Sequence, residues 1–284
     1  MGTSKPDLEW HGSTLLRRTV GIVARATGGP VVVVRARGQE LPSLPPGTIV
    51  VDDPREGKGP VQGIAAGLAA LGALPTPGPP GRPGTAGGAA EIAFVCSTDL
   101  PFLHPAFIRC VLRAITEDDA DVALPVAGGY QQPLAAAYRV SLAAAAERLV
   151  ADGRLRPAFL FDECVVTRID EGRLRQDPLL AAVDPELDSV RNVNSPADYR
   201  AARSLPAPEV TVEVTGDLAE DARRSGPRTV SPATVRAATV REAAEAVGLA
   251  SGRPIIACVN GDPAATDAET PLATGDHVAF SLSG

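Results

Sequence analysis

The stretch V-V-V-V, residues Val31–Val34, is the clearest indication of the fold. A continuous run of β-branched apolar residues is typical of a strand buried on both faces, as in a parallel sheet. Apolar residues at helical spacing from Leu15 to Val23 predict a helix before this strand, and Gly28 ends that pattern. The stretch therefore predicts a helix followed by a buried strand.

Strand and helix patterns continue to alternate after this run. We predict strands at Thr48–Val51, Glu91–Val95, Val122–Pro125 and Leu134–Tyr138, and helices at Gly63–Leu74, Pro105–Ile115 and from Ser195 onward. Such alternation indicates an α/β fold, a doubly wound and mostly parallel sheet of the Rossmann-like kind covered by helices. Pro75–Gly88, rich in Pro and Gly, is predicted to be a loop insertion.

The pattern of predicted strands and helices changes after S-L-P-A-P at Ser204–Pro208. We predict a first domain over 1–203, a linker over 204–209 and a second domain over 210–284. Predicted strands at Val210–Val214, Ile255–Val259 and Val278–Leu282 surround one helix, which starts at the capping box of Thr239. This pattern indicates a small α+β domain.

The composition and charge exclude some classes of protein and indicate what the core is made of. The 284 residues are 44% hydrophobic and only 4% aromatic, so the core must consist mainly of aliphatic side chains. A net charge of −7 argues against a general nucleic-acid binder. No apolar run is long enough to span a bilayer, and we expect a soluble cytoplasmic protein. The spacing of the four cysteines predicts free thiols and no zinc site.

Two acidic residues follow predicted strands, Asp53 and Asp99. Ligands of open parallel sheets bind at the carboxyl ends of strands, although strand-end acids are often ordinary loop caps. Asp53 precedes a glycine-rich segment ending at Gly63, and Asp99 begins the rigid turn D-L-P-F. A carboxylate beside phosphates needs a bridging cation, so Asp99 near a nucleotide implies Mg²⁺, with Lys5 as a second cation for the phosphates.

These segments together resemble the molybdenum cofactor guanylyltransferase family, which belongs to the nucleotidyltransferases of this fold. Five blocks occur in order over nearly all of residues 1–203. They are M-G-T-S-K at Met1–Lys5, Asp53 with G-K-G-P-V-Q-G ending at Gly63, D-L-P-F at Asp99–Phe102, Q-P-L-A-A-A-Y at Gln132–Tyr138, and N-V-N-S-P-A-D at Asn192–Asp198. Each block alone is weak, and the ordered set is specific.

The resemblance implies transfer of GMP from GTP to Mo-molybdopterin, with release of pyrophosphate. By analogy, Lys5 and Asp99 are catalytic, with Asp99 on Mg²⁺ and Lys5 on the phosphates. The remaining implied site residues are Asp53, Gly59 and Pro60 for the nucleotide and Asn192 and Asn194 for the pterin or metal side. Such transfer depends mainly on positioning and charge neutralisation, for which this small set is sufficient.

Two alternatives remain open. One is cytidylyl transfer to the same cofactor, or nucleotidyl transfer to another acceptor, by the same fold. The other is a degenerate, non-catalytic protein whose second domain is the working part. The family's first strand and its L-A-G-G-x-S-x-R loop are absent before Met1. We expect Met1 to be an internal methionine of a longer natural protein, because the later blocks are intact.

The second domain is similar to the β-grasp sulfur-carrier proteins of the molybdopterin and thiamine pathways. The similarity is carried by Thr239–Leu249, Ile255–Gly261 and Pro271–Phe280. Those carriers end in Gly-Gly, whereas this chain ends in Ser283-Gly284. The resemblance implies that the C-terminal carboxylate of Gly284 is the group that carries sulfur. It also implies that molybdopterin synthase or an adenylating enzyme is a partner. A docking module or a generic β-grasp domain is the alternative.

Overall fold

The computed structural model describes residues 5–55, 57, 59–74, 90–215, 218, 232–249, 255–264 and 267–282. The chain divides into two compact units, residues 1–22 with 192–284, and residues 23–191. This division falls at residues 22 and 191, and the boundary expected at 204–209 stays a prediction. Met1–Ser4, the predicted loop insertion at 75–88 and Gly284 lie outside the described residues.

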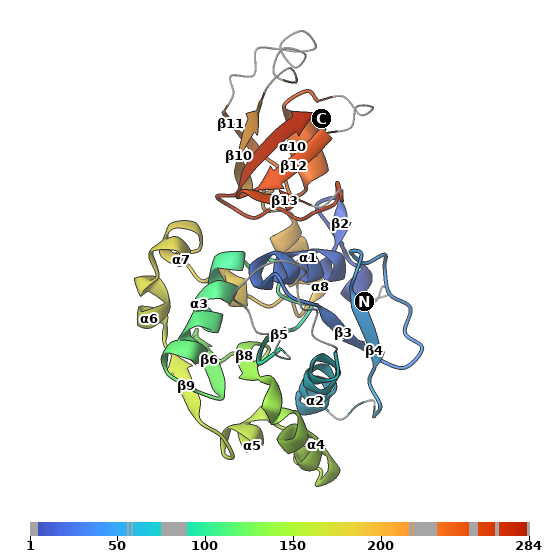
Figure 1. Ribbon diagram of the computed structural model, residues 1–284, viewed down its shortest axis with the longest axis vertical. Helices are drawn as coiled ribbons and strands as arrows, with labels where there is room; N and C mark the ends of the chain where they lie inside the picture. The colour runs from blue at the N-terminus through green and yellow to red at the C-terminus, as the bar shows by residue number, and fades with distance from the viewer. Residues whose placement is uncertain are drawn as a thin grey trace, which may run out of the picture. The chain divides into compact units, whose positions relative to one another are not determined.

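The unit of residues 23–191 alternates strands with helices (Figure 1). Its strands are β3 (Val32–Arg35), β4 (Ile49–Asp52), β5 (Ile92–Cys96), β6 (Val122–Ala127), β7 (Tyr130–Gln131), β8 (Ala135–Arg139) and β9 (Val166–Ile169). Its helices are α2 (Gly59–Gly72), α3 (Pro105–Glu117), α4 (Ala143–Ala151), α5 (Pro157–Phe161), α6 (Glu171–Gln176) and α7 (Pro178–Val183), with short 3₁₀ turns η2 (Val140–Leu142) and η3 (Asp188–Val190). The predicted strands and helices of this region are confirmed, with shifted ends.

The strands of this unit form two sheets in the described part of the chain. β3 and β4 pair in parallel. The larger sheet has the order β5-β8-β6 with β9 on β6, and β7 pairs with the end of β6. β6 and β9 are parallel, but β8 runs antiparallel to both β5 and β6. The expected α/β fold is present, with two antiparallel strands, β8 and the short β7, in its larger sheet.

The V-V-V-V strand is less buried than its sequence predicts. In β3 only Val33 is buried, with 9% of its surface exposed, while Val32 and Val34 are half-buried. β3 has β4 as its single strand partner among the described residues. The expectation of burial on both faces was therefore wrong, because burial depends on neighbouring strands that the run itself does not specify.

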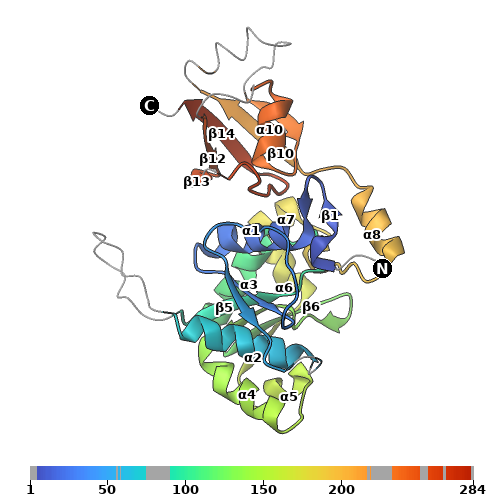
Figure 2. The ribbon, with the colours of Figure 1, turned by 90° about the vertical axis from the view of Figure 1, so that its right-hand side faces the viewer.

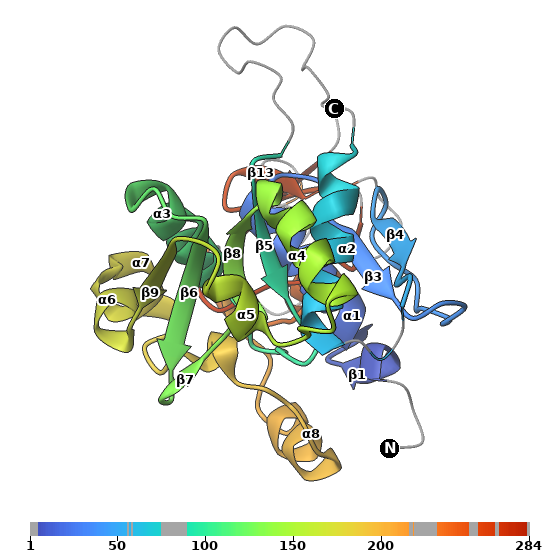
Figure 3. The same cartoon turned by 90° about the horizontal axis from the view of Figure 1, so that it is seen from below.

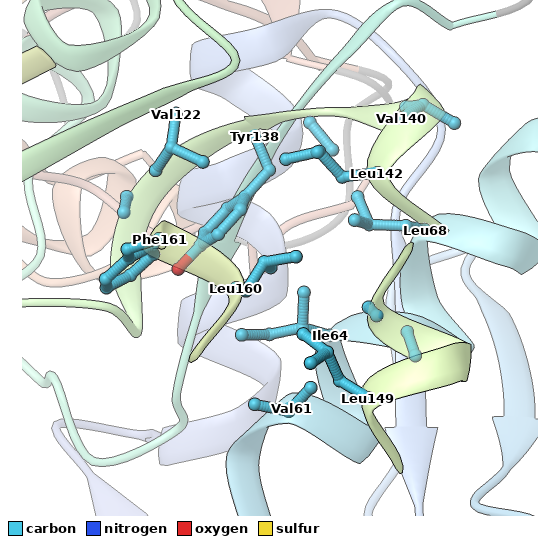
Figure 4. Close-up of a cluster of buried hydrophobic side chains, with 14 of the residues drawn as sticks. Val61, Ile64, Leu68, Val122, Tyr138, Val140, Leu142, Leu149, Leu160 and Phe161 are labelled. Carbon is cyan, nitrogen blue, oxygen red and sulfur yellow. The ribbon is translucent and has the colours of Figure 1, made fainter. Parts of the chain in front are cut away.

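The main core of this unit lies between α2 and the larger sheet (Figure 4). Ile64 and Leu68 of α2 are each 1% exposed and pack with Leu149 of α4 and Tyr138 of β8. Burial of each aliphatic side chain contributes about 1.5–3 kcal/mol relative to exposure. The Tyr138 hydroxyl donates to the Pro133 carbonyl at 2.8 Å, so this buried polar group has a partner. This hydrogen bond joins two residues of the block Q-P-L-A-A-A-Y, Tyr138 and Pro133.

Helices cover both faces of the larger sheet (Figure 3). α2, α4 and α5 lie over one face, where the core of Figure 4 is formed. α3 packs on β6 and β8 from the other side, and α6 and α7 follow β9 on that side. This layering is that of a doubly wound α/β unit.

The other unit begins with a small hairpin. After η1 (Lys5–Asp7), β1 (Glu9–Trp10) pairs antiparallel with β2 (Ser13–Thr14). The turn residues His11 and Gly12 have φ of 44° and 77°, the left-handed values that a tight two-residue hairpin turn requires. Trp10 is buried, with 3% of its surface exposed. Helix α1 (Leu15–Thr27) follows directly.

Helix α8 (Pro196–Arg203) is fixed to this hairpin. Ser195 and Asp198 form a capping box at its start, where the sequence predicts a helix to begin. Arg203 Nε lies 2.6 Å from Glu9 Oε2, and the Tyr199 hydroxyl donates to the Glu9 carbonyl oxygen. The hairpin and α8 are therefore one packed element, although about 190 residues separate them in sequence.

A five-stranded mixed sheet follows (Figure 2). Its order is β11-β10-β14-β12-β13, with β10 and β14 parallel and the other pairs antiparallel. The elements are β10 (Glu209–Val214), β11 (Ala233–Arg236), α10 (Val240–Ala246), β12 (Ile255–Val259), β13 (Asp262–Ala264) and β14 (His277–Leu282). The alternating side chains of β10 are buried as predicted, with Val210, Val212 and Val214 facing α10 in a separate core.

Candidate active site

Asp99 lies in the turn that follows β5. The Ser97 hydroxyl donates to Asp99 Oδ1, and the Ser97 amide donates to the Leu134 carbonyl at 3.1 Å. Leu100 and Leu103, 3% and 1% exposed, hold the turn against the protein interior, and Leu103 N–H donates to the Leu100 carbonyl at 3.1 Å. The half-buried carboxylate is thus held at a strand end, as the sequence predicts.

Asp53 lies directly after β4 and has a capping role. Its amide donates to the Arg35 carbonyl at 2.6 Å, which extends the pairing of β3 with β4 by one residue. Its carboxylate Oδ1 accepts the Arg55 amide at 2.9 Å. The neighbouring Asp52 pairs with the Arg35 guanidinium at 2.8 Å. The structure therefore shows Asp53 as a loop cap, and its predicted contact with a nucleoside stays a prediction.

The glycine-rich segment leads into α2 earlier than the sequence pattern indicates. The helix was expected from Gly63, but it begins at Gly59, with Pro60 in its first turn, where proline is well tolerated. Gly57 and Gly59 have φ of 74° and 71°, conformations that favour glycine. A Cβ at Gly63 would meet nothing within 4 Å, so sterics do not require glycine there. Gly59 and Pro60 are exposed and can face a ligand.

Lys5, Asn192 and Asn194 belong to the other unit. Lys5 starts η1, and its carbonyl accepts the Leu8 amide at 3.2 Å. Asn192 and Asn194 are exposed on either side of Val193, which is 2% exposed. The predicted site residues are thus divided between units, because Asp53, Gly59, Pro60 and Asp99 lie in residues 23–191.

Metal-ligand side chains do not form a cage in the described residues. No group of three or more His, Cys, Asp or Glu side chains there could hold a metal ion. A lone Asp99 carboxylate still fits Mg²⁺ in the form common at phosphate-transfer sites, where one or two carboxylates act together with substrate phosphates and water. Burial, together with the Asp99 charge, raises the pKa of the Cys96 thiol to about 12, so Cys96 is not a thiolate ligand at neutral pH.

The cysteines and His104 have surroundings that explain their positions. All four cysteines are free thiols, as expected, and burial raises the pKa of Cys164 to about 11. His104 is the N-cap of α3, where its Nδ1 accepts the Ala106 amide at 3.0 Å. These groups therefore need no catalytic role to explain their positions.

Three residues near the Asp99 turn were missed by the sequence analysis. Ser97 contacts Asp99 directly, and its position two residues before the aspartate is a signal that could have identified it. Ser189, in the segment after α7, accepts the His104 amide at the end of this turn, and the Ser189 amide in turn donates to Asp184. No local pattern indicates this contact, because Ser189 and His104 are 85 residues apart.

Comparison with known proteins gives the family of the chain. The model of the MobA-like NTP transferase domain matches residues 1–165. This chain belongs to the MobA-like NTP transferase family. Curated relatives agree: a protein named probable molybdenum cofactor guanylyltransferase from Mycobacterium avium is 32% identical over 189 residues, which are 66% of this chain and 80% of the relative. Its counterpart in Mycobacterium tuberculosis H37Rv is 34% identical over 171 residues, 60% of this chain and 76% of the relative.

A solved structure shares the fold. Molybdopterin-guanine dinucleotide biosynthesis protein A from Archaeoglobus fulgidus aligns with a TM-score of 0.53 at 21% identity, covering 71% of this chain and 90% of that protein. The family membership makes this MobA-like protein a nucleotidyltransferase, an enzyme acting on nucleoside triphosphates. No helix in the described residues is both long and apolar enough to cross a membrane.

Proposed function

We propose that this MobA-like enzyme transfers GMP from GTP to Mo-molybdopterin in molybdenum cofactor biosynthesis. The terminal phosphate oxygen of the acceptor attacks the α-phosphorus of GTP, and the bond to pyrophosphate breaks. The proposal is supported by the family match and by relatives that are named guanylyltransferases. It is also supported by the D-L-P-F turn at the end of β5, where Ser97 holds the Asp99 carboxylate. Transfer of this kind requires positioning and charge neutralisation more than covalent chemistry.

Asp99 is proposed to hold Mg²⁺ at the phosphates. When bound, the ion neutralises charge on the triphosphate and the leaving pyrophosphate. Ser97 fixes one carboxylate oxygen of Asp99 by hydrogen bonding, which restricts the orientation of the carboxylate. Lys5 is proposed to contact the phosphates, where its compact charge suits a phosphate oxygen.

The remaining residues are proposed to contact the two substrates. Asp53, Gly59 and Pro60 would face the nucleotide, since they lie at the loop between β4 and α2 and the start of that helix. Free amide groups in the first turn of a helix favour an anionic ligand. Asn192 and Asn194 would face the pterin or metal side, and their exposure on either side of a buried valine supports that assignment.

Substitution of Asp99 by asparagine tests the metal assignment. Asp99→Asn keeps the shape of the side chain and removes its charge, so we expect Mg²⁺-dependent pyrophosphate release to fall by about 10²–10³-fold, as for loss of one electrostatic stabiliser. Asp52→Asn is the matched control, because Asp52 is the last residue of the strand β4 and pairs with Arg35. An Asp99→Asn enzyme with full activity and an unchanged Mg²⁺ requirement contradicts the assignment.

The choice of nucleotide is tested by competing GTP against CTP. With purified Mo-molybdopterin as acceptor, we expect pyrophosphate release with GTP and a much lower kcat/KM with CTP. A preference for CTP would assign the enzyme to cytidylyl transfer within the same fold. Release with neither nucleotide, in the presence of Mg²⁺ and acceptor, would contradict the proposed reaction.

We further propose that residues 210–284 form a β-grasp domain related to sulfur carriers. The strand order β11-β10-β14-β12-β13, with its central parallel pair and the helix α10, supports this assignment. Carrier function would require the Gly284 carboxylate to be adenylated and then converted to a thiocarboxylate. Molybdopterin synthase or the adenylating enzyme would then be the protein partner.

Intact mass spectrometry tests the carrier function. The full chain is incubated with an adenylating enzyme of the pathway, ATP and a sulfur donor. A carrier gains the mass difference between sulfur and oxygen at its C-terminus, and a Gly284→Ala variant is the control. An unchanged mass would leave the domain as a docking or structural module.

A further inference from the structure

A buried carboxylate lies close to the turn that carries Asp99, on a segment that none of the sequence blocks includes. Asp184 follows α7 and has 7% of its surface exposed. Its Oδ1 accepts the Asp188 amide at 2.7 Å and its Oδ2 accepts the Ser189 amide at 3.1 Å. The Ser189 hydroxyl is a further hydrogen-bond partner of this carboxylate. Among the described residues, Asp184 forms no ion pair.

Ser189 connects this carboxylate to the start of α3. Its side chain is fully buried, and its oxygen accepts the His104 amide at 3.1 Å. A hydroxyl has one donor and can accept as well, so Ser189 can serve Asp184 and His104 at the same time. The chain of contacts therefore runs from Asp184 through Ser189 to the backbone of His104.

His104 is the last residue of the turn that begins at Asp99. Between them, Leu100 and Leu103 are buried, and the Arg191 guanidinium lies 5.2 Å from the centre of the Phe102 ring. The segment that contains Ser189 thus contacts the turn at two points. Ser97 holds the turn at its other end, on Asp99 itself.

A carboxylate buried without a cation is costly unless hydrogen bonds satisfy it. Here burial raises the pKa of the Asp184 carboxyl, while the bonds from Ser189 and Asp188 and the charge of the His104 ring act in the opposite direction. A fully bonded buried network of this type restricts its members to one arrangement. The network ends on the backbone of the 99–104 turn, so that turn is the part of the protein it fixes.

We propose that Asp184 and Ser189 are positioning residues for nucleotidyl transfer, which hold the 99–104 turn so that the Asp99 carboxylate is oriented toward the metal and the nucleotide phosphates. The proposal rests on the function proposed for Asp99 above. Neither residue contacts the reacting atoms, and both act through His104 and the turn.

Two variants test the proposal in the full chain. Ser189→Ala removes the link to His104, and Asp184→Asn replaces one acceptor oxygen by an amide of similar shape. The matched control is Asp170→Asn, because Asp170 accepts the Arg173 amide at the start of α6 in a similar way and lies outside the network. If Ser189→Ala does not fold, Asp184→Asn carries the test alone.

The readouts are hydrogen exchange of the His104 amide and Mn²⁺ affinity with GTP present and no acceptor, measured by electron paramagnetic resonance. For Ser189→Ala and Asp184→Asn we expect about tenfold faster exchange and about tenfold weaker Mn²⁺ binding, the change that loss of one buried hydrogen bond produces. In turnover with Mg²⁺, kcat should fall more than KM rises. Asp170→Asn should leave all of these unchanged.

Unchanged His104 exchange and Mn²⁺ affinity in the two variants would overturn the proposal, even if their melting temperatures fell. The Asp99→Asn variant separates this outcome from failure of the proposed function. If Asp99→Asn weakens Mn²⁺ binding and Ser189→Ala does not, the positioning role alone is wrong. If Asp99→Asn also has no effect, Asp99 is not a metal ligand, and both proposals are wrong.

Discussion

At the scale of single residues, the two strand-end carboxylates differ in their partners. Asp53 accepts the amide of Arg55 in its own loop, whereas Asp99 receives a side-chain hydroxyl from Ser97. The first arrangement is a common loop cap, and in the second a side-chain hydroxyl restricts the orientation of the carboxylate. Asp99 is therefore the better supported of the two predicted site residues.

A pH-dependent contribution to stability is expected from Asp118, at the end of α3. Arg173 contacts both of its carboxylate oxygens, at 2.5 and 3.1 Å. This pairing, together with the Thr167 hydroxyl, lowers the pKa of Asp118 below its usual 3.8. A lowered carboxyl pKa contributes stability above pH 3.8, and that stability is lost as the pH falls through the folded-state value.

Asp118→Asn should therefore lower the melting temperature at neutral pH by a small amount, because the pair is exposed. The difference from the unmodified protein should persist down to about pH 5 and narrow below 3.8. Thermal unfolding followed by circular dichroism measures it. In the Asp118→Asn background, Arg173→Gln should cost less than it does alone. A difference that grows on acidification would show that the pairing does not stabilise the fold.

At the scale of secondary-structure elements, strong local patterns predicted the structure well. The strands β4, β5 and β10 and the starts of α8 and α10 were found where expected, although at α10 only the Thr239 half of the predicted capping box is present. The hairpin of β1 and β2 was not predicted as strands, because two residues are too few to show a period. The six-residue helices α6 and α7 were missed for the same reason.

Other features depend on partners distant in sequence. The A-A-A-Y segment predicts the strand β8 but not its antiparallel direction, which follows from its pairing with β5 and β6. The position of Asp99 after a strand is a local property and was predictable. The Asp184–Ser189 network is a long-range property, and it became visible only in the folded chain.

Two helical glycines should respond to alanine in opposite directions. A Cβ at Gly21 in α1 would lie 2.5 Å and 2.6 Å from two ring carbons of Pro271, whereas at Gly67 in α2 it would lie 3.5 Å from Val34 Cγ2, an ordinary contact. Alanine within a helix normally gains about 0.5–1 kcal/mol over glycine. Overpacking against a rigid ring costs about 1–3 kcal/mol, so Gly21→Ala should destabilise the protein on balance.

Urea unfolding of the two variants measures these changes. Gly67→Ala should raise the unfolding midpoint and Gly21→Ala should lower it, with similar m-values in both. Gly21→Ala combined with Pro271→Gly should recover part of the loss, because the ring that meets the new methyl group is gone. A stabilised Gly21→Ala protein would mean that Pro271 does not pack against α1.

At the scale of the whole molecule, the first residues of the chain belong to the same compact unit as its C-terminal part. Residues 1–22 and 192–284 form one compact unit. Arg17 Nη2 lies 2.6 Å from Asp267 Oδ2, and the buried Arg18 donates to the Leu272 carbonyl at 3.0 Å. The start of α1 is therefore packed with the segment between β13 and β14, and the predicted boundary at 204–209 would separate these partners.

A chain that ends at residue 203 should consequently lose order at its beginning. We expect faster amide exchange in residues 15–22, which lose the partners supplied by Asp267, Pro271 and Leu272, while α2 keeps its protection in the core of the other unit. Hydrogen exchange with mass spectrometry on both chain lengths makes the comparison. In the full chain, Arg18→Met should produce a weaker form of the same change, because it keeps the aliphatic stem and removes the donor. Equal protection of residues 15–22 at both lengths would show that residues 1–203 fold as an independent domain, as the sequence alone predicts.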